Sequence, residues 1–184
     1  WWILNLQNLF ILELGYWPPG VSHFWTLAVE QQYYLVWPLL ILLCPRKSLA
    51  PLLLLLTLVS PLTRSISADK GWLSMDLNPA ALVDDFALGS LLALGKHRSF
   101  LRSRRMMDTM GVLALACYAY LYISWELDRA VPFWCHLQQT FLAIAFTSLI
   151  ARASEGRCGP FSQLLELRWL VSLGKWSYGI YLFH

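Results

Sequence analysis

One carboxylate stands inside an apolar segment near the start of the chain, at Glu30 in the run 23–38. A charged side chain in such a segment is costly, so it indicates a functional site or a paired structural one. On a helix, Thr26, Tyr33 and Trp37 share the face of Glu30. This polar and aromatic face suits the wall of a water-filled cavity better than a surface that faces lipid. The alternative, a carboxylate paired with a neighbouring helix, stays open.

A second pair of carboxylates, Asp84 and Asp85, follows Asn78-Pro79. Asn before Pro predicts a helix that starts with an Asn N-cap and Pro at the first position. Ala81, Asp85, Gly89 and Ala93 then recur every four residues, and small residues at this spacing let helices pack closely. We therefore expect Asp85 to point into the bundle and Asp84 elsewhere. Alternatively, both carboxylates only complement the helix dipole.

The last segment carries a third polar group. Ser177, Tyr181 and His184 fall on one helix face, where a hydroxyl, a phenol and an imidazole could relay a proton or bind a sugar. We expect this face to line the inside of the bundle, with Glu30, Tyr33 or Asp85 as partners. Three polar residues on a membrane helix can equally make only interhelical hydrogen bonds.

The composition indicates a membrane protein. Of 184 residues, 58% are hydrophobic and 14% are charged, whereas soluble domains are about 25% charged. The net charge of +3 is too small to imply a polyanion, so no nucleic-acid partner is expected. The spacing of the four cysteines and of the histidines matches no metal motif, and we expect neither a metal nor a bound cofactor.

Seven apolar stretches predict an all-α, polytopic transmembrane helix bundle in the lipid bilayer. The complete stretches approach the roughly 20 residues that cross a bilayer core. The chain, 1–184, is interpreted as a single membrane domain truncated at both ends. The expected spans are 1–14, 25–44, 49–66, 79–95, 110–125, 132–151 and 169–184.

Loop charges predict the orientation of these spans. Eleven of the 14 Lys and Arg residues lie in or beside the loops at 45–48, 96–108 and 152–175. The alternate loops carry only Arg64, Lys70 and Arg129. Because positive loops stay in the cytoplasm, the first group is expected to be cytoplasmic and the second to face outward. The predicted location is the inner or plasma membrane, with several passes.

Three motifs resemble the acyltransferase-3 family of integral-membrane O-acyltransferases. The run 24–38, FWTLAVEQQYYLVWP, is similar to the family pattern W-S-L-(A/S)-V-E-(E/Q)-Q-(F/Y)-Y-L-x-W-P, with Thr26 in place of the usual Ser and Gln31 in place of the commoner Glu. The tail 173–184, LGKWSYGIYLFH, is similar to L-G-x-x-S-Y-x-x-Y-L-x-H, and 85–93 is similar to a middle helix ending in G-x-L-L-A.

The resemblance implies an enzyme of about ten helices that moves an acyl group, often acetyl, from acyl-CoA to a hydroxyl of a carbohydrate or glycolipid. Acceptors in the family include surface polysaccharides and lipopolysaccharide. The family's catalytic histidine lies on a first helix that this sequence does not contain. Glu30 is then expected to support catalysis, and His184 is a further catalytic candidate. The expected substrate-binding residues are Trp25, Tyr33, Trp37, Asp85, Ser177 and Tyr181.

Two further interpretations remain at this point. Arg102, Arg104 and Arg105 could attract CoA phosphates, although topology alone explains basic residues in a cytoplasmic loop. A rival function is a transporter or flippase of lipid-linked sugar, in which Glu30 and Asp85 would bind substrate or protons.

Overall fold

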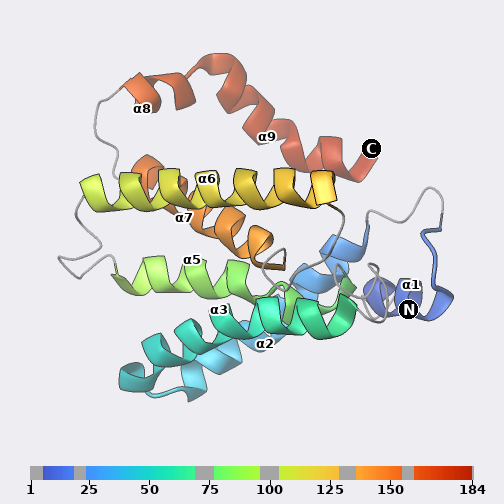
Figure 1. The fold of residues 1–184 in the computed structure, drawn as a ribbon. Coiled ribbons are helices and arrows are strands. Elements are labelled where there is room, and N and C mark those ends of the chain that lie inside the picture. Colours follow the sequence, from blue (N-terminus) through green and yellow to red (C-terminus); the bar gives the residue numbers. More distant parts are fainter. Residues whose placement is uncertain are drawn as a thin grey trace.

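The structure, a computed structural model, describes residues 6–18, 24–68, 77–95, 104–128, 136–154 and 160–183. Within these ranges every regular element is a helix, which confirms the predicted all-α class (Figure 1). The elements are α1 (Gln7–Leu14), α2 (Trp25–Leu43), α3 (Arg46–Ala68), the 3₁₀ helix η2 (Pro79–Ala81), α5 (Val83–Gly95), α6 (Arg104–Asp128), α7 (Gln138–Ser154), α8 (Pro160–Leu165) and α9 (Arg168–Phe183).

In the described part of the chain, each predicted apolar stretch contains a helix. Two helix boundaries have residues that explain them. The Asn78 side chain accepts a hydrogen bond from the Ala80 amide at 3.0 Å, with Pro79 at the start of η2, as the sequence predicts. Helix α1 ends at Gly15, whose left-handed φ of 73° lets its amide bond to the Ile11 carbonyl.

Helices α3, α5, α6 and α7 form the body of the described part of the molecule. Helix α6 packs along α7, α7 contacts α5, and α5 lies against α3 (Figure 1). Helix α2 docks on α5 through Val29, Tyr33 and Val83, and Leu49, Leu53 and Ala87 join α3 to α5. Figure 1 shows that α3, α5, α6 and α7 run in alternating directions, as expected for spans whose loops alternate between the two sides of a membrane.

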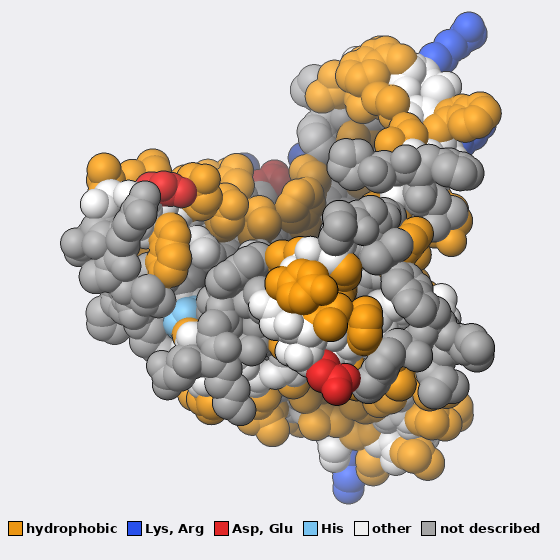
Figure 2. All heavy atoms as spheres, turned by 90° about the vertical axis from the view of Figure 1, so that its right-hand side faces the viewer, with side chains coloured by type: hydrophobic (Ala, Val, Ile, Leu, Met, Phe, Trp, Pro, Cys, Tyr) orange, Lys and Arg blue, Asp and Glu red, His pale blue; other side chains and the backbone are white. Residues whose placement is uncertain are grey.

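Helices α8 and α9 stand apart from this body. They form the upper part of the molecule in Figure 1 and the upper lobe in Figure 2. Between residues 163 and 178 every residue except Leu170 is exposed. The described contact of α9 with the body is therefore near its carboxyl end.

Many large apolar side chains are exposed on the outside of the described helices, and Figure 2 shows some of them on one face. Leu35, Leu42 and Leu58 are each at least 70% exposed, whereas Arg64 and Asp84 are buried. This distribution is the reverse of that in a soluble protein and suits helices surrounded by hydrocarbon. Among the described helices, α3 and residues 105–127 of α6 are long and apolar enough to span a membrane.

Candidate functional site

The structure joins the first and last sequence motifs. The hydroxyls of Thr26 and Tyr181, 155 residues apart, are hydrogen-bonded between the first turn of α2 and the last turns of α9. Both ends are predicted to face outward, so the contact agrees with the topology expected from the loop charges. Tyr181 thus has a partner on another helix, but it is Thr26 and not one of the expected three.

Glu30 lies one helical turn below this contact, on the same face of α2 as Thr26. Its side chain is exposed, as is that of Gln31. Trp25 is half-buried beside them, with its ring 6.1 Å from that of Trp17. The site therefore combines two hydroxyls, an accessible carboxylate and an indole, which are groups that bind sugar hydroxyls and sugar faces.

Deeper on α2, Tyr33 and Trp37 dock the helix onto α5. Tyr33 is 7% exposed, its ring stacks on Phe86 at 3.9 Å, and its hydroxyl donates to the Pro79 carbonyl. The Trp37 indole donates to Ser90 Oγ at 2.9 Å. Both rings thus pack α2 against α5, and both are less exposed than Glu30 and Gln31.

The orientation expected for the two aspartates was wrong. Asp84 is fully buried, and Asp85 is exposed. The small residues Gly89 and Ala93, expected to pack against another helix, are exposed as well, and a Cβ added at Gly89 would meet nothing within 4 Å. The buried face of α5 carries Asp84 and Ala87 instead.

Asp84 belongs to a charged network that links α3, α5 and α7. Arg64 Nη2 lies 2.7 Å and 2.8 Å from the two carboxylate oxygens of Asp84. Arg64 Nη1 donates to the His136 carbonyl and to Thr140 Oγ1, and Thr140 donates to Asp84 at 2.6 Å. The Asp84 amide donates to Ser60 Oγ. Such a satisfied network orders the core of the bundle, and its groups are not available to a substrate.

Sequence reasoning missed this network. Arg64 falls at the end of the stretch 49–66, and the charge pattern counts it with an outer loop. A cation inside a predicted span, however, requires a buried carboxylate partner. That rule applied to Arg64 would have pointed to Asp84 or Asp85.

The expected polar stripe on α9 is only partly formed. Ser177 is exposed, and its hydroxyl donates to the Gly174 carbonyl of its own helix at 2.8 Å. Ile180 is 56% exposed, as expected for the apolar side of this helix. His184 lies outside the described residues, as do Arg102 and the side chain of Arg104. Within the described ranges no three His, Cys, Asp or Glu side chains gather as metal ligands would.

An all-helical fold with charges inside and leucines outside is typical of helical membrane proteins. Over its whole length the chain is 26% identical to the "Putative peptidoglycan O-acetyltransferase YrhL" of Bacillus subtilis. It is 25% identical to the peptidoglycan O-acetyltransferase OatA of Listeria monocytogenes and 24% to the O-acetyltransferase OatA of Staphylococcus aureus. The chain spans only 31–32% of the length of these relatives.

These relatives are members of the acyltransferase-3 family, so they confirm the resemblance that the three motifs indicate. No family model matches the chain. No solved structure matches it either. The transporter alternative gains no support from the relatives.

Proposed function

We propose that this chain is part of a membrane O-acetyltransferase that acetylates hydroxyls of a cell-wall glycan, with peptidoglycan as the acceptor. The observation that carries the proposal is similarity over 100% of the chain to O-acetyltransferases, two of which are named for peptidoglycan. This acceptor replaces the broader expectation of surface polysaccharide or lipopolysaccharide.

The proposed acetyl donor is acyl-CoA from the cytoplasmic side. A base, expected from the family resemblance to be a histidine outside this chain, removes the proton of the glycan hydroxyl. The oxygen attacks the thioester carbonyl, the new C–O ester bond forms, the C–S bond breaks, and the CoA thiolate takes up the proton. General-base assistance of this kind contributes about 10²–10⁴-fold.

The proposed role of the Thr26–Tyr181 contact is to build the acceptor side of the site. The exposed Glu30 carboxylate accepts hydrogen bonds from acceptor hydroxyls or orients the catalytic histidine, and Trp25 offers an apolar face to the sugar. These roles follow from exposure and position at one end of α2.

The proposed location is the bacterial inner membrane, crossed several times. Two of the seven predicted spans correspond to α3 and α6, which are by themselves long and apolar enough to cross a membrane. The shorter α5 has only 13 residues, about 20 Å, and is proposed to cross together with η2, which precedes it in the expected span 79–95.

The test is glycan acetylation by the full-length protein in a bacterial host that lacks O-acetylated peptidoglycan. Acetate released from purified cell walls by mild alkali reports transfer. We expect Glu30→Gln to lower it about tenfold or more, a loss of about 1.4 kcal/mol in transition-state stabilisation. Glu126→Gln is the matched control, because Glu126 is an exposed carboxylate near the same predicted membrane surface.

Two outcomes of this experiment count against the proposal. If cell walls release no acetate although the wild-type protein accumulates normally, peptidoglycan is rejected as the acceptor. Normal acetylation by a normally accumulating Glu30→Gln variant would show that Glu30 has no role in the site. It would not affect the assignment of peptidoglycan as the acceptor.

A further inference from the structure

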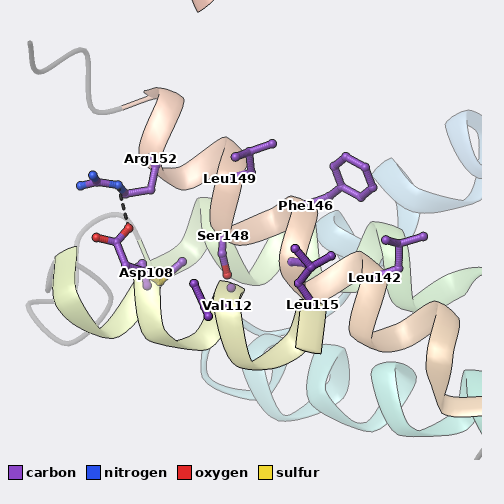
Figure 3. Close-up of a pocket in the computed structure, with 11 residues that line it drawn as sticks. Asp108, Val112, Leu115, Leu142, Phe146, Ser148, Leu149 and Arg152 are labelled. Atoms are coloured by element: carbon purple, nitrogen blue, oxygen red, sulfur yellow. Dashed lines mark ion pairs between the residues drawn. The ribbon is translucent and has the colours of Figure 1, made fainter. Parts of the chain in front are cut away.

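A groove of about 500 Å³ runs between α6 and α7 on the outside of the bundle (Figure 3). Its walls are two helical stripes, one from each helix. On α6 the stripe comprises Met107, Asp108, Gly111, Val112 and Leu115, and on α7 it comprises Leu142, Ala145, Phe146, Leu149 and Arg152. Ser148 also lines the groove, but its hydroxyl donates to the Ile144 carbonyl and adds no unsatisfied polar group.

The length of this groove corresponds to one leaflet of a bilayer. From Arg152 to Leu142 the α7 stripe covers ten residues, or about 15 Å at 1.5 Å per residue. Half of a hydrocarbon core of about 30 Å is the same length. The apolar part of the groove therefore matches an extended acyl chain in one leaflet.

A pair of opposite charges closes one end of the groove. Arg152 Nε lies 2.8 Å from Asp108 Oδ1, and the two side chains are 32% and 48% exposed (Figure 3). Arg152 belongs to the last turn of α7, and Asp108 lies one turn after the start of α6. Because residues 105–127 form a candidate span, both charges lie where lipid headgroups begin.

We propose that this groove binds a phosphatidylethanolamine molecule, with one acyl chain between α6 and α7. The Arg152 guanidinium pairs with the lipid phosphate, and the Asp108 carboxylate accepts hydrogen bonds from the ethanolamine ammonium. The charges of the ion pair thus match those of the zwitterionic headgroup, one to one. A choline headgroup has no N–H to donate, and a glycerol headgroup has no cation for Asp108.

The inference is independent of the proposed acetyl transfer, since it depends only on the groove and its ion pair. Its test uses the full-length protein reconstituted with a phosphatidylethanolamine that carries a diazirine in one acyl chain. After irradiation, labelled peptides are mapped by mass spectrometry. We expect labels on 111–115 and 142–149, displaced by unlabelled phosphatidylethanolamine far better than by phosphatidylcholine or phosphatidylglycerol.

Variants separate the groove from general contact with lipid. Val112→Trp fills the groove and is expected to reduce labelling about tenfold, or about 1.4 kcal/mol. Leu113→Trp is the matched control, because Leu113 is 64% exposed beside Val112 at 68% but does not line the groove. Asp108→Asn is expected to abolish the preference over phosphatidylcholine, and Arg152→Gln to weaken labelling by all phospholipids.

Three results would overturn the proposal. Equal labelling of Val112→Trp and Leu113→Trp would mean ordinary lipid contact. Equal displacement by all three unlabelled lipids would reject the headgroup assignment. Absence of label from both stripes in the wild-type protein would mean that protein, such as another helix, fills the groove.

Discussion

Arg64 and Asp84 form an ion pair inside the bundle, in which Arg64 Nη2 contacts both carboxylate oxygens, at 2.7 Å and 2.8 Å, and the carboxylate is fully buried. The pair connects the carboxyl-terminal part of α3 to the first turn of α5, and Thr140 extends it to α7. Buried ion pairs cost desolvation, so their net contribution to stability can be small, whereas removing one partner strands a charge. The pair therefore specifies how three helices dock.

The first prediction concerns this stranded charge. Asp84→Asn in the full-length protein is expected to lower the free energy of unfolding by about 3–5 kcal/mol, because Arg64 then stays buried without a counter-charge. Thermal unfolding in detergent, followed by tryptophan fluorescence, measures the loss. Asp85→Asn is the control and should change stability little, since Asp85 is exposed. The interpretation fails if the two variants are equally stable.

A double variant adds an independent check. Arg64→Met combined with Asp84→Leu removes both charges and should recover most of the loss, because apolar replacement of a buried pair is often neutral. A double variant less stable than Asp84→Asn would show that the network contributes net stability.

A second prediction concerns the close packing of α6 against α7 at Gly111. A Cβ added at Gly111 would lie 3.0 Å from Ser148 Cβ, which is tighter than an ordinary contact. Gly111→Ala should therefore push the helices apart and cost about 1–3 kcal/mol by overpacking. Gly89→Ala is the matched control, with open space around its Cβ and helix propensity in its favour. Equal melting temperatures of the two variants would contradict this packing.

Helix positions could be predicted from the sequence, but the rotation of α5 could not. Long apolar runs and the Asn78-Pro79 signal indicate where helices occur. The orientation expected for Asp85, however, requires that Ala81 and Asp85 lie on one continuous α-helix. The structure starts with the 3₁₀ turn η2, and Leu82 has non-helical backbone angles, so the phase shifts before α5 begins. The buried position consequently belongs to Asp84, where Arg64 is available.

The polar stripe on α9 could be predicted only in part, for a different reason. The expectation required each polar side chain to find a partner on another helix. Ser177 instead satisfies its hydroxyl within its own helix, as serine often does. Tyr181 is longer, cannot bond back to its own turn, and reaches Thr26. The pairing depends on the tertiary approach of α2 and α9, which no local pattern contains.

A third prediction tests the orientation of the bundle. In a parent protein without cysteine, Ser154→Cys should resist a membrane-impermeant maleimide added to intact cells, and Leu127→Cys should react. Both positions are exposed, at the end of α7 and near the end of α6. The expectation rests on the 11 to 3 division of basic residues between alternate loops. Labelling of Ser154→Cys but not Leu127→Cys would invert the topology.

The last prediction concerns the hydroxyl pair that joins the two family motifs. If the Thr26–Tyr181 bond holds α9 against the acceptor side of the site, Tyr181→Phe in the full-length protein should lower glycan acetylation about tenfold. The positioning role predicts that Thr26→Val causes a similar loss and that the double variant loses little more, because each single change already breaks the same bond. Tyr178→Phe is the control, since Tyr178 is 64% exposed on the same helix. Accumulation in membranes and melting temperature distinguish a displaced helix from a misfolded protein. Fully additive losses, or an equal loss in Tyr178→Phe, would show that the two hydroxyls do not act through their mutual bond.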